Sequence, residues 1–334
     1  MGRLSATIHY NTGAKVNFLL DGLTFLRYYA PVALEASRRG HACRFFIKKS
    51  NKYNCPYVEK NMNMLLSFCE PNGFSIHSHE ELHSYPGLCF LIEGGMVEFL
   101  GPQHHSVSLT YMTDFRISYE KYIDAVDNVI FPSELFAQHY NTISDKNLYL
   151  GSPKYDFESD PDEVYKSYNL SKENKYCLII YPKLRDLHKV DIEKVIQIAD
   201  KLGYTSIIKH REKDKPRKKY NCKTYGDFRW FPHTTLDLLT VSDIVINTGS
   251  TTVKEAVMKQ VPILNFNIKS HHEHLVFLYD HNFCVNQKQF SDNELLKSMD
   301  HLTTNNFDAQ FTKCKKDQLF VGNSTNKILD YFNV

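Results

Sequence analysis

The chain is most constrained by an alternation that runs along most of its length. Short apolar runs rich in β-branched and aromatic residues alternate with stretches of helical periodicity. KVNFLLDG (residues 15–22) is typical of a strand, APVALEASRRG (30–40) of a helix stopped by glycine, and HACRFFIKK (41–49) of the next strand. The sequence therefore predicts an α/β fold whose parallel sheets are covered by helices on both faces.

The alternation is interrupted once and then restarts. Strand-like runs continue to residues 127–133, where Ser133 is placed to cap the next helix, and a polar stretch at 157–174 follows. A new series of strands and helices begins with KYCLIIYP (175–182). Since 334 residues suffice for about two domains, we predict two Rossmann-like doubly wound domains facing a cleft. The expected ranges are 1–155 and 175–305 for the domains, 156–174 for a linker and 306–334 for a C-terminal helical segment.

Composition limits the functional classes. A formal charge of +2 does not suggest a nucleic-acid partner. No run approaches the roughly 18 to 20 apolar residues of a membrane span, and the N-terminal sequence lacks a secretory apolar core, so we expect a cytoplasmic protein. The eight cysteines show no metal-binding spacing and are expected to be reduced and mostly buried. The basic run KHREKDKPRKK (209–219) is either a solvated loop or a source of cations for the cleft.

The segment SDIVINTGSTTVKEAVMKQVPILNF (242–266) carries the strongest candidate site. A strand-to-helix turn at residues 248–252 directs backbone N–H groups and the helix dipole at a ligand such as phosphate. The turn consists of Thr248, Gly249, Ser250, Thr251 and Thr252. Gly249 would allow a ligand to approach the backbone closely. The alternative is that the turn binds nothing and that Ser250 or Thr251 only caps the helix. Glu255 could bind ribose hydroxyls or merely favour the helix start. The pattern is not a P-loop, and GxGxxG is absent.

Charged residues after other strands are further candidates, because ligands of parallel sheets bind at the carboxyl ends of the strands. In the second half, the candidate phosphate partners are Lys183, Arg185, Lys209 and Arg211, which could equally be solvated. In the first half, the candidate bases are Asp21 and Glu93, which follow strand-like runs, and His104 and His105, which lie just before the run SVSLTYM. The histidines are favoured because imidazole titrates near neutrality, although a surface pair in a loop is the alternative.

Two further motifs indicate no metal site. HHEH at residues 271–274 is dense in possible metal ligands but lacks a supporting pattern; since it follows the strand VPILNF, it could instead line the cleft. DPD at residues 160–162 lies in the linker, where turn-forming residues are expected. Without an Asp-x-Asp metal site, we expect any chemistry on a diphosphate to be independent of metal.

Residues 242–266 resemble the donor-binding signature of GT-B glycosyltransferases and of their relatives, the UDP-N-acetylglucosamine 2-epimerases and CDP-glycerol-type phosphotransferases. The shared order is a leucine-rich helix, Ser-Asp, a strand, Gly-Ser, a helix with Glu, Pro and a strand. Here LDLLTVSD, Gly249, Glu255 and Pro262 match it. GHACRFF, FPSELFAQHY, LGSPKYD and IIYPKLRD resemble other parts of these proteins, so the similarity spans most of the chain.

This sequence departs from the pattern in two places. The family often has glycine before the proline, where this chain has Gln260 and Val261. The epimerases usually carry Gly-Thr-Arg-Pro-Glu after the first strand, where DGLTFLRYY stands here. The second departure weighs against an epimerase.

The resemblance implies a glycosyltransferase that moves a sugar from a nucleotide-diphosphate-sugar donor to a glycan or lipid-linked acceptor, with no metal and no cofactor. It also implies a histidine in catalysis near His104 and His105, as in the phosphotransferases. A nucleotide-sugar 2-epimerase and a non-catalytic nucleotide- or glycan-binding protein are the alternatives. The donor base, sugar, linkage and oligomeric state are left open, as is peripheral contact with a membrane.

Overall fold

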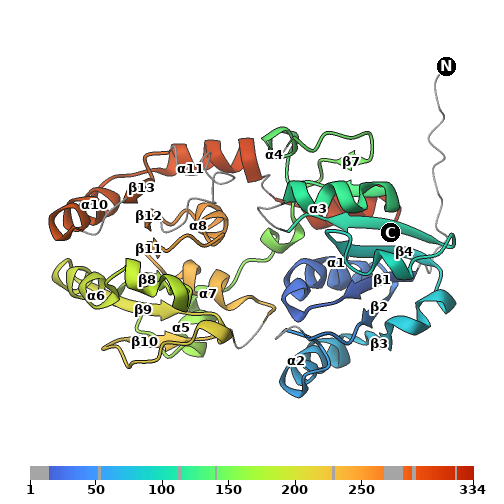
Figure 1. The fold of residues 1–334 in the computed structure, drawn as a ribbon, viewed down its shortest axis with the longest axis horizontal. Helices are drawn as coiled ribbons and strands as arrows, with labels where there is room; N and C mark the ends of the chain where they lie inside the picture. The colour runs from blue at the N-terminus through green and yellow to red at the C-terminus, as the bar shows by residue number, and fades with distance from the viewer. Residues whose placement is uncertain are drawn as a thin grey trace. The chain divides into compact units, whose positions relative to one another are not determined.

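The computed structural model describes residues 15–51, 54–111, 115–139, 141–227, 230–266, 281–287, 291–319 and 322–334. The chain divides into two compact units (Figure 1). Unit 1 comprises Met1–Phe157 and Phe320–Val334, and unit 2 comprises Glu158–Leu319. The stretch expected to be a linker therefore belongs almost wholly to unit 2, and the end of the chain returns to unit 1.

Unit 1 is built on a parallel sheet of seven strands in the order β3-β2-β1-β4-β5-β6-β7. The strands are β1 (Lys15–Leu20), β2 (Ala42–Ile47), β3 (Ser75–Ser78), β4 (Gly87–Ile92), β5 (His104–Leu109), β6 (Asn128–Ile130) and β7 (Asn147–Leu148). The helices are α1 (Leu26–Arg38), α2 (Glu59–Cys69), α3 (Phe115–Tyr122), α4 (Glu134–His139) and α12 (Ser324–Tyr331). The strand order reverses between β1 and β4.

Unit 2 has a parallel sheet of six strands in the order β10-β9-β8-β11-β12-β13, which reverses between β8 and β11. The strands are β8 (Lys175–Ile180), β9 (Tyr204–Lys209), β10 (Lys223–Tyr225), β11 (Ile244–Asn247), β12 (Ile263–Phe266) and β13 (Cys284–Gln287). The helices are α5 (Pro161–Ser167), α6 (Ile192–Lys201), α7 (Thr234–Thr240), α8 (Val253–Met258), α10 (Asp292–Thr304) and α11 (Asp308–Cys314). Helices α6 and α10 pack together on one side of this sheet, and α5, α7 and α8 form a second group (Figure 1).

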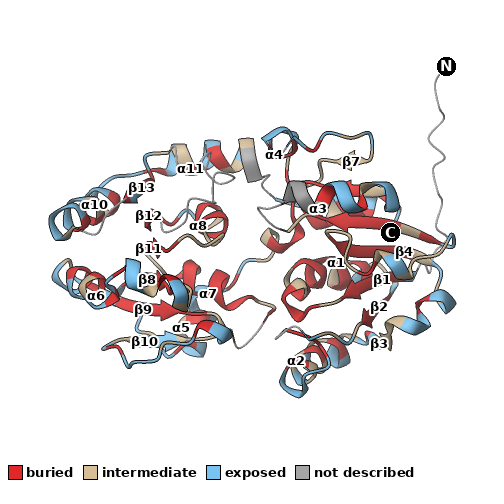
Figure 2. Ribbon diagram, in the orientation of Figure 1, coloured by how far each residue is buried: buried red, intermediate tan, exposed pale blue. Residues whose placement is uncertain are grey.

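The predicted α/β class with two doubly wound parallel sheets is confirmed. Figure 2 shows the central strands buried and the outer sides of the helices exposed. In unit 1 the ring of Phe18 stacks between Phe45 and Phe90, with centroid distances of 5.0 and 5.6 Å. Seven of the eight cysteines are buried, as expected, and Cys222 is half-buried.

Three elements differ from the expected pattern. Helix α1 begins at Leu26 and continues through Pro31, because burying Leu26, Tyr28 and Tyr29 at roughly 1.5 to 3 kcal/mol each outweighs the proline penalty of about 3 kcal/mol. The polar stretch at 157–174 contains α5, whose N-terminus is capped by Asp160 at 2.9 Å from the Asp162 N–H. Strand β5 begins at His104, before the expected SVSLTYM run.

One local feature agrees with its sequence signal, and a second ties the two ends of unit 1 together. Ser133 Oγ accepts the Phe136 N–H at 3.1 Å and so caps α4 as predicted. Asp156, the last residue of the LGSPKYD motif, accepts the Thr325 N–H at the start of α12, which ties the end of the chain to unit 1.

Among the residues with described placement, no helix is both long and apolar enough to cross a membrane.

Candidate functional site

The turn at residues 248–252 leaves the carboxyl end of β11, next to β8, where the strand order of unit 2 reverses. Reversal points of open α/β sheets are the usual place for a ligand. The Thr248 hydroxyl donates to the carbonyl of Ile180, the last residue of β8, at 2.7 Å. Gly249 has φ +67°, a left-handed conformation that suits glycine. Thr248 and Gly249 thus shape the turn and anchor it to the neighbouring strand.

Ser250 and Thr252 form a small hydroxyl cluster within this turn. Their hydroxyl oxygens lie 3.0 Å apart, and Ser250 Oγ accepts the Thr252 N–H at 3.3 Å. The Ser250 N–H donates to Oδ1 of Asn247, also at 3.3 Å. Two backbone N–H groups of the turn are therefore engaged internally, so a ligand would meet the hydroxyls as well as the remaining N–H groups.

Glu255 lies in the first turn of α8 and is only 5% exposed. A carboxylate near a helix N-terminus is stabilised by the helix dipole. Its neighbours from Val253 to Val257 are also buried. Glu255 is therefore part of the packed base of the turn and not a solvated surface residue.

Three of the predicted cations lie on two loops that Asp214 holds together. Its Oδ1 accepts the Leu184 N–H at 3.1 Å, and its Oδ2 lies 2.5 Å from a guanidinium nitrogen of Arg211. The loop after β8, with Lys183 and Arg185, is thus fastened to the loop after β9. The Arg185 side chain has its Nε 3.6 Å from the Asp186 carboxylate but is 71% exposed, so its outer face is accessible to an anion.

Lys209 occupies a different environment. It is 5% exposed, and its ammonium group is bonded to the Asp227 carboxylate. The imidazole Nε2 of His233 lies 3.8 Å from the same carboxylate, and the Trp230 ring stacks on His233 at 5.6 Å. Lys209 is therefore held in an internal ion pair, and the structure does not group it with the accessible Arg185.

Asp21 and Glu93 are brought together in unit 1. They follow β1 and β4, the neighbouring strands between which the strand order reverses. A Cβ built on Gly95 would lie 3.7 Å from the Asp21 carboxylate, which places Asp21 beside the turn that begins with Glu93. Glu93 has φ +47°, and its Oε1 accepts the Tyr111 N–H at 3.1 Å. Strained backbone of this kind is concentrated at functional sites.

His104 and His105 lie elsewhere. They begin β5 and pair with the first residues of β4, about 16 Å along the strand from the edge where Asp21 and Glu93 lie. Nδ1 of His104 accepts the Gly101 N–H at 2.9 Å, so Nε2 carries the proton and donates to the Leu82 carbonyl at 3.2 Å. Because β5 runs parallel to β4, the histidines that open β5 lie at the amino edge of the sheet, opposite the carboxyl edge where the two acids lie.

His105 is also engaged in structural contacts. Its Nε2 lies 2.9 Å from Oδ1 of Asn128, its Nδ1 lies 3.9 Å from the Asp127 carboxylate, and its ring lies 5.5 Å from that of Phe332. These contacts join the amino ends of β5 and β6 to the C-terminal segment. The HHEH motif at 271–274 lies outside the described residues.

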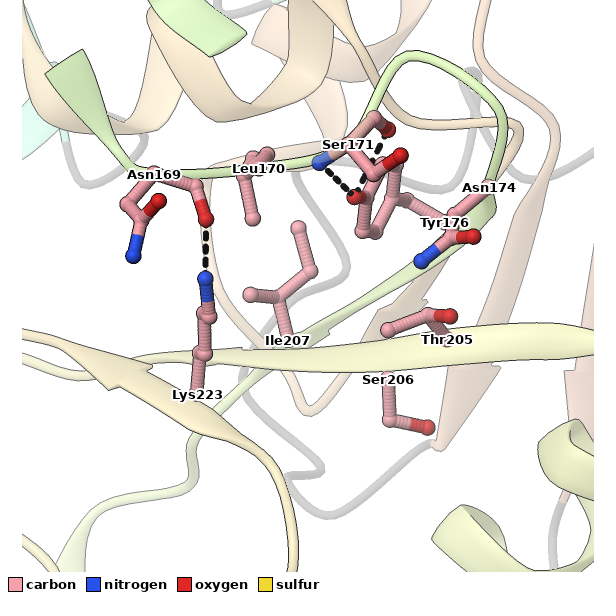
Figure 3. Close-up of a pocket in the computed structure, with 9 residues that line it drawn as sticks. All are labelled: Asn169, Leu170, Ser171, Asn174, Tyr176, Thr205, Ser206, Ile207 and Lys223. Atoms are coloured by element: carbon pink, nitrogen blue, oxygen red, sulfur yellow. Dashed lines mark hydrogen bonds between the residues drawn. The ribbon is translucent and has the colours of Figure 1, made fainter. Parts of the chain in front are cut away.

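A pocket of about 280 Å³ lies at the opposite edge of the unit 2 sheet (Figure 3). Its walls come from the amino ends of β8, β9 and β10 and from the chain before β8. The Tyr176 hydroxyl is bonded to the N–H and carbonyl of Ser171, and Lys223 to the carbonyl of Asn169. None of the candidate residues lines this pocket, and these polar groups are bonded to one another, so we do not place the donor there.

Sequence reasoning missed the partners Asp214, Asp227 and Asn247. Asp214 is three residues after Arg211, a spacing that could have indicated a local ion pair. Asp227 follows β10, which at three residues is too short to be recognised from periodicity. Asn247 ends a predicted strand, but its partner depends on the order of the strands in the sheet.

The sequence matches no model of a protein family and no curated protein. Its structure is similar to several solved ones. The wall teichoic acid polymerase TagF has a TM-score of 0.68 at 11% identity, covering 97% of this chain and 89% of that chain. A UDP-GlcNAc 2-epimerase from Methanocaldococcus jannaschii has a TM-score of 0.59 at 12% identity, covering 96% and 99%. A glycosyltransferase from Rickettsia africae ESF-5 has a TM-score of 0.54 at 10% identity, covering 97% and 98%.

These likenesses establish the fold that the chain shares with glycosyltransferases, the polymerase and the epimerase. The resemblance to GT-B proteins and their relatives noted in the sequence is confirmed for the fold.

Proposed function

We propose that this protein is a glycosyltransferase that takes its sugar from a nucleotide-diphosphate-sugar donor bound at the carboxyl edge of unit 2. The observation that carries the proposal is the convergence of three loops at the reversal of strand order. Thr248 fastens the 248–252 turn to the end of β8, and Asp214 fastens the loop after β8 to that after β9. The fold shared with a solved glycosyltransferase and with the teichoic acid polymerase supports the same reading.

The residues suit a diphosphate leaving group. Arg185 and Arg211 offer planar guanidinium groups that bind phosphate oxygens in pairs, with Lys183 on the same loop as Arg185. The hydroxyls of Ser250, Thr251 and Thr252 add donors from the turn, and Glu255 at its base is assigned to the ribose hydroxyls. Cations and hydroxyls fixed before the reaction stabilise the charge that develops on the diphosphate, so the proposal requires neither a metal nor a cofactor.

In the proposed reaction, an acceptor hydroxyl forms a bond to the anomeric carbon as the bond from that carbon to the diphosphate breaks. The nucleoside diphosphate departs, and the hydroxyl proton passes to a carboxylate. We assign this base to Asp21 or Glu93, which share one edge of unit 1, and not to His104 or His105, which begin β5 at the other edge. The proposed acceptor is a glycan or a lipid-linked sugar.

A nucleotide-sugar 2-epimerase is the second candidate, favoured by the fold shared with the Methanocaldococcus jannaschii enzyme. An epimerase converts its nucleotide sugar without an acceptor. A transferase releases nucleoside diphosphate in proportion to acceptor glycosylated. Following both the sugar and the nucleotide by chromatography separates the two reactions.

The first test is thermal stabilisation by uridine, cytidine and guanosine diphosphates and their sugars. A ligand held only by the folded state at about 100 times its Kd adds roughly 2.7 kcal/mol of stability. We expect stabilisation by one base family, which is weakened in Arg211→Ala and in Glu255→Gln. Arg217→Ala, which removes an exposed cation of the same basic run, is the matched control and should bind normally. Stabilisation by none of these nucleotides would refute the donor site, whereas binding without turnover of any donor would favour a non-catalytic binding protein.

A further inference from the structure

Three asparagines form a ladder across neighbouring strands of unit 2. Asn247 on β11 is in register with Asn265 on β12, and Asn265 with Asn286 on β13. Nδ2 of Asn247 donates to Oδ1 of Asn265 at 2.7 Å, and Nδ2 of Asn265 donates to Oδ1 of Asn286 at 2.9 Å. Asn247 is fully buried and Asn265 is 2% exposed. The ladder thus runs from inside the sheet to its edge strand.

The backbone of the 248–252 turn sets the direction of the ladder. The Ser250 N–H can only donate, so the oxygen of the Asn247 amide must face it, as observed at 3.3 Å. The nitrogen of Asn247 then faces Asn265, which must present its oxygen, and the same reasoning orients Asn286. Each of the two buried amides both accepts and donates, which strengthens the chain of hydrogen bonds.

Amides are an unusual choice at these positions. The rest of β11 and β12 is apolar and buried, as is typical of central parallel strands. A buried amide is costly unless its hydrogen bonds are made, and a leucine or valine would pack here without that requirement. The ladder therefore specifies a geometry that an apolar core would not provide.

We propose that Asn247, Asn265 and Asn286 are positioning residues for the donor's diphosphate. They act through the backbone N–H of Ser250, which donates to Asn247. The Ser250 hydroxyl in turn accepts the Thr252 N–H and contacts the Thr252 hydroxyl. The ladder itself touches no reacting atom. This inference rests on the proposed function, because it deepens the role of the 248–252 turn as the diphosphate site.

The main test compares Asn265→Leu, which removes both central hydrogen bonds at similar volume, with Tyr168→Phe. The control deletes a hydrogen bond of 2.7 Å to buried Asp237 in the same unit without touching the turn. Amide hydrogen exchange over residues 248–252 is measured in the ligand-free protein. Affinity is measured for a nucleoside diphosphate and for the same nucleoside without phosphates.

We expect Asn265→Leu to speed exchange at the turn and to weaken the diphosphate about tenfold, the equivalent of one or two hydrogen bonds. Nucleoside affinity should stay unchanged, and Tyr168→Phe should alter neither turn exchange nor phosphate affinity. Asn286→Ala, which removes the outer acceptor of the ladder, should give a smaller change in the same direction and serves if Asn265→Leu does not fold.

Unchanged exchange at the turn, equal losses for both ligands, or the same effects in Tyr168→Phe would overturn the positioning role. If the wild-type protein binds no nucleoside diphosphate, the proposed function fails. The exchange measurement still decides in that case whether the ladder holds the turn.

Discussion

The ion pair between Lys209 and Asp227 gives the sharpest prediction. Both side chains are almost completely buried, and the sequence alone placed Lys209 among the phosphate partners. In Lys209→Met the ammonium is lost while the volume is nearly kept, and Asp227 remains as a buried carboxylate without its cation. Breaking a buried pair in this way costs about 3 to 5 kcal/mol, a large part of the roughly 5 to 15 kcal/mol that stabilises a typical domain.

The double variant Lys209→Met with Asp227→Leu is the matched control. Replacing both partners by apolar residues is often neutral or stabilising, so the double variant should recover most of the lost stability. Trp230 is the only tryptophan of the chain and stacks on His233 beside this pair. Its fluorescence during urea unfolding therefore reports on unit 2 directly.

The opposite pattern would refute this reasoning. If Lys209→Met kept the urea midpoint of the wild type and lost only nucleotide affinity, Lys209 would be a ligand of the phosphate. The double variant would then be as poor a binder as the single one, with no gain in stability.

Three further predictions follow from local geometry. Gln260 has φ +58° and is exposed after α8, where the N–H groups of residues 260 and 261 close the helix. A left-handed backbone strains a residue that has a Cβ, so Gln260→Gly should stabilise unit 2 by about 0.5 to 1 kcal/mol. Urea unfolding measures this gain. A hydrogen bond from Arg38 lowers the pKa of Glu35 from 4.5 to about 2. The stability that the ionised Glu35 contributes to the fold is therefore complete above about pH 4.5 and lost toward pH 2. Acid unfolding followed by circular dichroism should show a weaker pH dependence in Glu35→Gln, and equal profiles in the two proteins would contradict the assignment. Asp21→Asn should slow sugar transfer about 10²- to 10⁴-fold if Asp21 is the base, whereas His104→Ala should lower the melting temperature and leave the initial rate per folded molecule unchanged; the reverse result would restore the histidine.

Much of the fold could be predicted because its signals are local. Central parallel strands are buried on both faces and appear as continuous apolar runs, so β1, β8 and β11 were recognisable from their own residues. The cap at Ser133 and the turn after β11 follow from short-range chemistry. Gln260 adopts a left-handed conformation that favours glycine, at a position where the resembled sequence pattern often has glycine.

The candidate site could be predicted only in part. The sequence placed Asp21, Glu93 and Arg211 after strands, and the structure puts them at the carboxyl edges. It also suggested His104 and Lys209, but the pairing of β5 with β4 puts His104 at the amino edge, and Lys209 is paired with an acid beside β9. Those are properties of pairing between distant segments, and no periodicity within a segment encodes them.

The sequence by itself determined the α/β class, the two series of strands and the position of the 248–252 turn, because each depends on residues within a few places of one another. Only the tertiary structure decided that Lys209 pairs with Asp227, that two histidines lie far from the acids of unit 1, and that three asparagines line up behind Ser250. The physical reason is that the partners lie on separate strands, even where those strands follow one another in the chain. A polar group at the end of one strand therefore finds its partner through the register of its neighbours, which forms only on folding.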